Sequence, residues 1–164
     1  MTSGHVKELV DHWRRLRGDG LRPTAGSLAI KRFVAEYTLE LPEDFRSYVE
    51  LTDGICDNDS GVHFWSLSEI DRVPNILTGE KTRTIDLTLP AHLPDASNLF
   101  VFADVFISSY FYAIRLSGGE SEVFWIGHGE WWRASTNFNE FCGIYQRGGD
   151  DLAFIGEPRL ASEQ

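Results

Sequence analysis

Apolar residues recur at the spacing of an amphipathic helix in four segments of the chain. These segments are residues 5–17, 27–37, 39–54 and a stretch that begins at 137–140. Glycines and a proline within 18–26 separate the first two segments. In the third segment Pro42 suits the first helical turn, and Gly54 suits a left-handed exit. In the last one Asn137 is placed to cap the helix and Glu140 to complete a capping box.

The second half of the chain changes to the period of β-strands. Four aromatic and β-branched runs are predicted as strands, at residues 99–103, 110–116, 122–126 and 130–134. The short connections SGGES and GHG predict that the last three form an antiparallel meander. Phe100 and Phe102 point one way while Leu99 and Val101 point the other, so both faces are apolar. We therefore expect the helices to cover part of each face.

The pattern between the third helix and these strands is weaker. Residues 62–65 predict a short strand, and the following SLSE has the form of a capping box. That box predicts a short helix running to Val73 and ended by Pro74. Residues 75–97 are interpreted as a long irregular connection, with an edge strand at 84–89.

The composition indicates a single globular domain. The chain has 164 residues, of which 42% are hydrophobic and 13% aromatic, enough to bury a core. No apolar run approaches the roughly 20 residues of a membrane span, and the N-terminus lacks the regions of a signal peptide. The expected location is therefore cytoplasmic, away from membranes. Cys56 and Cys142 lie far apart and fit reduced thiols better than a disulfide framework.

The net charge of −10 is unevenly distributed along the chain. Residues 1–40 carry seven basic and five acidic residues, a net of +2, while residues 41–164 carry eight and twenty, a net of −12. Proteins that grip nucleic acid usually have the opposite sign, so we expect no nucleic-acid partner. The acidic bulk serves solubility or provides a surface for a basic partner.

No residue pattern predicts a catalytic or metal centre. The five histidines lack HExxH or paired Cys/His spacing, so no metal or cofactor is expected. The loop at 53–59 carries three aspartates but departs from an EF-hand, which leaves a solvated or partner-facing loop, with a divalent-ion site as the alternative. An enzyme would need an acid/base pair from Asp104, His128 and Glu130. The last two flank a hairpin glycine and better suit a hydrogen-bonded turn.

The ordered succession of these elements resembles the SUKH superfamily. The resemblance runs through LELPEDFRSYVELTDG, SLSEIDRV, LFVFADV, the meander and RASTNFNEFCGIY, and it covers residues 27–147. The positions that carry it are Leu41, Pro42, Phe45, Asp53, Gly54, Trp65 and Phe141. The chain departs from the family at DVFISSYFY, where members often carry a Gly-rich turn.

The resemblance implies an α+β fold with a central, mostly antiparallel sheet flanked by N-terminal helices and a C-terminal helix. The expected single domain, 1–164, then has an extra N-terminal helix and linker at 1–26, a SUKH-like core at 27–147 and a tail at 148–164. The superfamily contains bacterial immunity proteins and fungal cell-wall-synthesis regulators. The resemblance therefore implies that this chain is a binding protein without catalytic activity.

Two functions follow as hypotheses. In the first, the chain is an immunity protein that neutralises a cognate toxin domain by direct contact, and its acidic surface attracts a basic toxin such as a nuclease. In the second, it is a regulatory or scaffold module that binds a housekeeping protein and uses the helix at 5–17 for docking.

The predicted contact face joins the 53–59 loop to the meander. Its charged residues are Asp53, Asp57, Asp59 and Asp104, and its apolar anchors are Tyr110 and Trp132. Trp131 and Trp132 are neighbours in one strand and must point to opposite faces. Either one of them is partly exposed as an anchor for a partner, or both faces of the sheet are covered.

Overall fold

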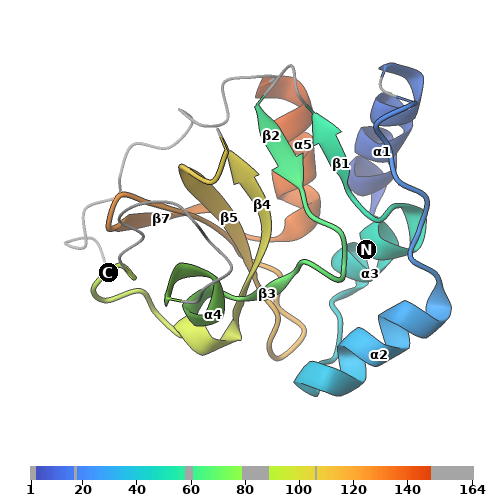
Figure 1. Cartoon of the computed structure of the whole chain (residues 1–164). Coiled ribbons are helices and arrows are strands. Elements are labelled where there is room, and N and C mark those ends of the chain that lie inside the picture. Colours follow the sequence, from blue (N-terminus) through green and yellow to red (C-terminus); the bar gives the residue numbers. More distant parts are fainter. Residues whose placement is uncertain (1–2, 17, 58–60, 79–88, 106, 149–164) are drawn as a thin grey trace.

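The structure is a computed structural model and describes residues 3–16, 18–57, 61–78, 89–105 and 107–148. These residues form five α-helices, one 3-10 helix and seven strands (Figure 1). The helices are α1 (Gly4–Leu16), α2 (Ser27–Tyr37), α3 (Glu43–Leu51), α4 (Val73–Thr78), η1 (Ala96–Asn98) and α5 (Phe138–Gly148). The strands are β1 (Ile55–Asp57), β2 (Val62–Phe64), β3 (Asp71–Arg72), β4 (Leu99–Val105), β5 (Tyr110–Arg115), β6 (Val123–Gly127) and β7 (Glu130–Ser135).

All strands of the described ranges belong to one antiparallel sheet. Its order is β1-β2-β4-β5-β6-β7, and β3 pairs with β4 beside this path. The meander of β5, β6 and β7 is the one predicted from the two short connections. The fold class is therefore α+β, with N-terminal helices and a C-terminal helix around a central sheet, as predicted.

The two faces of the sheet are covered by different elements. The face that carries Phe102 and Tyr112 packs against α1, α2, α3 and α5, and we call it the helix face. The face that carries Phe111 and Phe124 packs against α4 and the segment leading to β4, and we call it the α4 face. Figure 1 shows α4 set apart from the other four helices, across the sheet. Apolar side chains on both faces of β4 and β5 require this double cover, because each would otherwise lie in water.

The helices begin and end for the local reasons that the sequence predicts. Pro42 lies directly before α3 with a φ of −55°, and α3 buries Phe45, Tyr48 and Val49. In α5 the Asn137 side chain accepts the amide of Glu140 at 2.8 Å, which is the predicted cap. The Glu140 carboxylate reaches one residue further back than predicted and accepts the amide of Thr136 at 2.8 Å.

A β-bulge in β4 reverses the direction of its side chains. The register with β5 shifts between Val101 and Ala103, so Phe102 and Ala103 both join the helix-face core. The following residue, Asp104, lies opposite Phe111 and therefore shares the α4 face. The bulge is what places a carboxylate on that face of a central strand.

The segment after β2 differs from the prediction. Ser66 and Glu69 form the predicted capping bond, with the Ser66 amide 2.7 Å from the Glu69 carboxylate, but the next residues form β3 instead of a helix. Helix α4 begins only at Val73, so Pro74 lies in its first turn and does not end a helix. The first amides of a helix have no intrahelical acceptor, so a proline there loses no hydrogen bond.

Two further predictions concern the segments on either side of β2, β3 and α4. The loop expected at 53–59 is wrong for residues 55–57, which form β1 and pair with β2. The predicted edge strand at 84–89 lies, apart from Leu89, outside the described residues.

Helix α1 contributes a large part of the helix-face core, which generates a test of its role. Trp13 is only 2% exposed and meets Phe64 and Tyr145 edge-on, at centroid distances of 4.7 and 6.3 Å. We expect Trp13→Ala to lower the free energy of unfolding by about 3–5 kcal/mol, as for other buried aromatic truncations. Urea denaturation measures this change, and a loss below about 1 kcal/mol would mean that α1 is a loose appendage.

Candidate functional site

Three hairpin connections meet at one end of the sheet. The last row of paired positions runs from Asp57 through Val62 and Val105 to Tyr110, and Glu130 begins β7 at the same end. We call this row, with the connecting residues 61, 107–109 and 128–129, the hairpin end. It brings Asp57 and Tyr110 of the predicted contact face into one row.

The other predicted residues are more scattered. Asp104 lies one row further in, and Trp132 pairs with Trp125 in the row after that. Asp53 lies before β1, where its carboxylate accepts the Leu67 amide at 2.7 Å. Asp59 lies outside the described residues. Asp104 is on the α4 face, whereas Tyr110 and Trp132 pack on the helix face.

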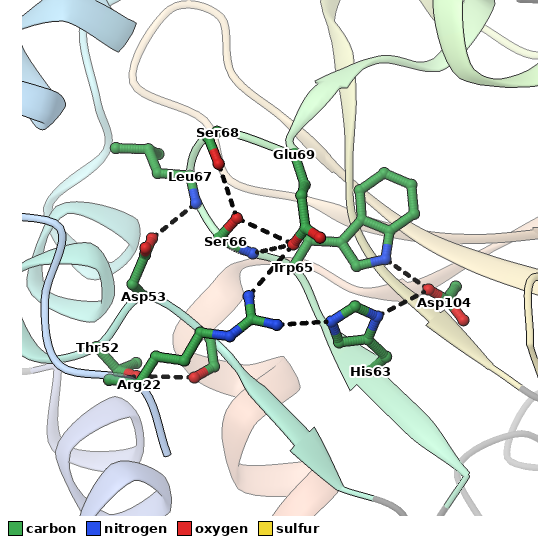
Figure 2. A network of polar contacts seen from close by, with 11 residues as sticks. Arg22, Thr52, Asp53, His63, Trp65, Ser66, Leu67, Ser68, Glu69 and Asp104 are labelled. Atoms are coloured by element: carbon green, nitrogen blue, oxygen red, sulfur yellow. Dashed lines mark hydrogen bonds and ion pairs between the residues drawn. The ribbon is translucent and has the colours of Figure 1, made fainter. Parts of the chain in front are cut away.

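Asp104 is a buried carboxylate with partners inside the protein. The residue is 7% exposed, and its side chain bonds to the indole N–H of Trp65 and to the Ser108 amide, the latter at 3.1 Å. The Nδ1 atom of His63, its cross-strand neighbour, lies 3.4 Å away (Figure 2). A carboxylate removed from water needs this number of donors to remain ionised.

The second ring nitrogen of His63 fixes the tautomer. Its Nε2 atom lies 3.3 Å from a guanidinium nitrogen of Arg22. A guanidinium can only donate, so Nε2 must accept and the proton of the neutral ring must sit on Nδ1, facing Asp104. Arg22 thus donates to His63, and His63 donates to Asp104, so these hydrogen bonds run in one direction from the N-terminal segment to the central strand.

Arg22 connects this series to the turn before β3. Its guanidinium also contacts the Glu69 carboxylate at 3.3 Å, and Glu69 in turn accepts bonds from Ser66 (Figure 2). Its backbone is held as well, because Thr52 donates to the Arg22 carbonyl at 2.9 Å and the Arg22 amide donates to Gly54 at 3.1 Å. The network therefore joins the segment after α1, the end of α3, β2 and β4.

The carboxyl groups of this network have lowered pKa values. Burial by itself raises the pKa of Asp104, but the hydrogen bonds from His63, Trp65 and the Ser108 amide outweigh it and hold the pKa below its ordinary value. Burial also raises the pKa of Glu69, but the hydrogen bonds from Ser66 and Arg22 outweigh this effect and leave the pKa lowered. Both groups stabilise the fold in their ionised form.

An aromatic stack occupies the helix face beside the hairpin end. Trp132 stacks on Trp125 at 3.7 Å, Tyr110 lies 4.4 Å from Trp125, and His128 meets Tyr110 at 4.8 Å. The Tyr110 ring covers Gly127, where an added Cβ would lie 2.3 Å from it. Tyr110 and Trp132 are half-buried, so each presents part of its ring to solvent.

The β4–β5 connection takes a left-handed backbone without glycine. Ile107 has a φ of 55° and Ser108 a φ of 63°, at the place where the chain departs from the SUKH pattern of a Gly-rich turn. This conformation is sterically strained for a β-branched residue such as isoleucine. Ile107 is also 88% exposed, so its side chain gains nothing from burial in this chain.

The structure does not bring the acid/base candidates Asp104 and His128 together. Asp104 is engaged on the α4 face, whereas His128 packs on Tyr110, which belongs to the helix face. Among the described residues, no group of three or more His, Cys, Asp or Glu side chains could hold a metal ion. None of the helices in those ranges is long and apolar enough to cross a membrane.

Sequence reasoning missed the roles of Arg22 and His63. Arg22 lies in the glycine-rich break between two predicted helices, and the spacing of His63 from the other histidines indicates no metal site. The alternation of β2, with Val62 and Phe64 on the helix face, does place His63 on the opposite side. Its partner depends on the register between β2 and β4, which alternation does not supply.

The buried carboxylate generates a prediction about acid stability. Because the pKa of Asp104 is lower in the folded state, its stabilisation is complete at neutral pH. It begins to fall near pH 4, around the ordinary aspartate pKa, and is lost below the folded pKa. We expect Asp104→Asn to cost about 1–3 kcal/mol at pH 7 and to flatten the acid limb of stability against pH.

Chemical denaturation at a series of pH values measures both effects. Asp19→Asn, which changes an exposed aspartate, is the matched control and should leave the curve unchanged. A variant at position 104 with the stability and acid limb of the parent would contradict the internal role of this carboxylate.

Comparison with known proteins shows to which family the chain belongs. No curated protein matches it significantly. The family model described as SMI1 / KNR4 family (SUKH-1) matches residues 25–143, which include α2 to β7 and the start of α5 and leave out α1. This match spans well over half of the 164 residues. The chain therefore belongs to the SMI1/KNR4 family (SUKH-1).

Proposed function

We propose that this chain is a non-catalytic immunity protein of the cytoplasm that neutralises a cognate toxin domain by direct contact. The observation that carries the proposal is its membership of the SMI1/KNR4 family, because SUKH proteins include toxin immunity proteins as well as regulators. The absence of a recognisable reactive set in the sequence is consistent with a protein that acts by docking.

The hairpin end is the docking surface we favour. The sequences of its connections, 56–62, 104–110 and 127–130, contain four acidic residues and neither lysine nor arginine. A basic toxin, such as a nuclease, would be attracted to this end and oriented by it. Asp104 contributes by holding the β4–β5 connection through the Ser108 amide, more than by meeting the partner itself.

Exposed apolar side chains at this end supply anchors. Ile107 projects from the β4–β5 connection, and Tyr110 and Trp132 lie behind it in half-buried positions. Apolar side chains beside acidic positions of the sequence match the usual anatomy of an interface, in which desolvated anchors contribute most of the affinity. The strain at Ile107 supports the same conclusion, because an isoleucine there has no stabilising role inside the chain.

The alternative is a regulatory or scaffold module that docks a housekeeping protein through α1. In favour of it, α1 lies outside the residues that the family model matches. Against it, the apolar side of α1 is already used, since Val6, Leu9, Val10 and Trp13 are buried in the helix-face core. A partner of α1 would meet a mostly polar surface, on which Leu16 is the exposed large apolar residue.

Co-expression tests the proposed function. The product of the neighbouring gene is expressed in a bacterial host with and without this chain. We expect growth arrest by the neighbour alone, rescue by co-expression, and a complex of the two purified proteins. A harmless neighbour, together with no rescue from any toxin of the same genomic region, would sink the proposal.

A single substitution tests the docking surface. We expect Ile107→Gly to weaken toxin binding by about tenfold or more, as for an interface anchor. The same change removes the left-handed strain, so the variant should unfold at an equal or higher temperature than the parent. Isothermal titration and thermal unfolding measure the two effects.

Leu28→Ala is the matched control, since Leu28 is 60% exposed on α2, away from the hairpin end. It should bind like the parent. Unchanged binding by the Ile107→Gly variant would remove the hairpin end from the interface while leaving the immunity function open to another surface.

A further inference from the structure

The two edges of the sheet are protected to very different degrees. At one edge β1 is only three residues long, and a bridge between Leu21 and Ile55 closes part of it. At the other edge β7 is six residues long, and no strand in the described part of the chain pairs with its outer side. Natural proteins blunt such an edge with lysine or other charges, with proline or with a bulge. EWWRAS contains neither proline nor lysine, and its irregularity lies at Ala134, beyond the regular pairing of Glu130 to Arg133.

The exposed edge of β7 carries an unusual amount of indole surface. Trp131 lies on the α4 face, 5.9 Å from Phe124, and Trp132 lies on the helix face over Trp125. Both tryptophans are half-buried, so part of each ring stands at the margin of the sheet on its own face. Half-exposed aromatic rings on both sides of an open strand are typical of a surface that another strand covers.

The charge of this edge is locally balanced in a strongly acidic chain. Glu130 and Arg133 are its two charged residues, both are exposed, and they cancel. Arg133 forms a long, exposed ion pair with Glu122 at 3.5 Å, and its charge also helps to lower the pKa of Glu140. Such exposed pairs contribute little to stability. An electrically neutral strip is where two copies with a net charge of −10 each repel one another least.

We propose that two copies of this chain associate by antiparallel pairing of their β7 edges, which joins the two sheets into one. This inference does not depend on the proposed immunity function. Regular pairing of β7 with β6 extends from Glu130 to Arg133, before the register shift at Ala134, and the new ladder runs along the outer side of Glu130 to Ala134.

Symmetry limits how the two strands can meet. Two antiparallel edges that continue one sheet are related by a two-fold axis perpendicular to it, so opposed residues must share a face. A centre at Arg133 would oppose two guanidinium groups, and a centre at Trp131 would oppose Glu130 to an indole. A centre at Trp132 instead places Trp131 opposite Arg133 of the second copy, on the α4 face.

The centre at Trp132 is favoured on both faces. An indole beside a guanidinium gains a cation–π contact, and this contact forms twice in the dimer. On the helix face the two Trp132 rings oppose one another and extend the Trp125–Trp132 stack of each copy. Trp131, Trp132 and Arg133 each gain a contact in this arrangement, while Glu130 lies opposite the small Ala134 of the second copy.

Sedimentation velocity of the full chain, from low micromolar to high micromolar concentration, tests the proposal. We expect a reversible monomer–dimer equilibrium that strengthens with salt, because salt screens the repulsion between two anionic copies. Arg133→Glu should weaken the dimer by about tenfold or more, since it removes both cation–π contacts and adds two negative charges.

Arg32→Glu is the control, because it makes the same change of charge at an exposed position on α2. It should leave the dimer constant within about twofold of the parent. Amide hydrogen exchange gives a second readout, in which β7 amides become more protected as the concentration of the parent rises, and the Arg133→Glu variant loses this effect.

A parent that stays monomeric over the whole range would overturn the proposal. So would a dimer that Arg133→Glu leaves intact, or one that both variants weaken equally, because the contact would then lie elsewhere or reflect net charge alone. Circular dichroism of each variant verifies that its fold is unchanged.

Discussion

Strand β4 is buried along its whole length, and the rest of the fold follows from that constraint. All seven of its residues are inaccessible, so each face needs cover, and each edge needs a partner strand for its backbone groups. The helices α1, α2, α3 and α5 supply one cover, and α4 with the segment before β4 supplies the other. Strands β2, β3 and β5 supply the partners.

One residue of β4 is charged, and it organises the polar part of the molecule. The bulge at Phe102 and Ala103 turns Asp104 to the α4 face, where water is excluded. The carboxylate is tolerated because His63, Trp65 and the Ser108 amide surround it with donors. Through His63 it also holds Arg22, and with it the segment that links α1 to the family core. The bond from the Ser108 amide also ties the β4–β5 connection to this carboxylate, and a preorganised surface loses less entropy when it docks.

The sequence predicted the elements that have a strong period and failed where the period is short. Helices α1, α2, α3 and α5 and the meander carry amphipathic or alternating patterns long enough to recognise. Strand β1 is three residues with an acidic end, and its identity depends on pairing with β2. Helix α4 was missed because Pro74 is compatible with both the end and the first turn of a helix, and only the pairing of β3 decides between them.

The sequence predicted part of the arrangement of the contact-face residues, but not their interactions. Asp57 and Tyr110 do share one row, because hairpins in a meander return to the same end of a sheet. Asp104 was expected to face a partner, and the structure gives it internal partners through a bulge and a register that a single sequence does not encode. Ile107 attracted no notice, since its exposure and left-handed backbone appear only in three dimensions.

The tautomer of His63 is the most direct test of the buried network around Asp104. Nitrogen-15 NMR of the imidazole ring at neutral pH distinguishes the two tautomers, with the exposed His92 as an internal reference. For the neutral His63 ring, the structure predicts a proton on Nδ1 and a bare Nε2. A neutral ring protonated on Nε2, or one that averages both tautomers, would contradict the buried network on which β4 and the hairpin end depend.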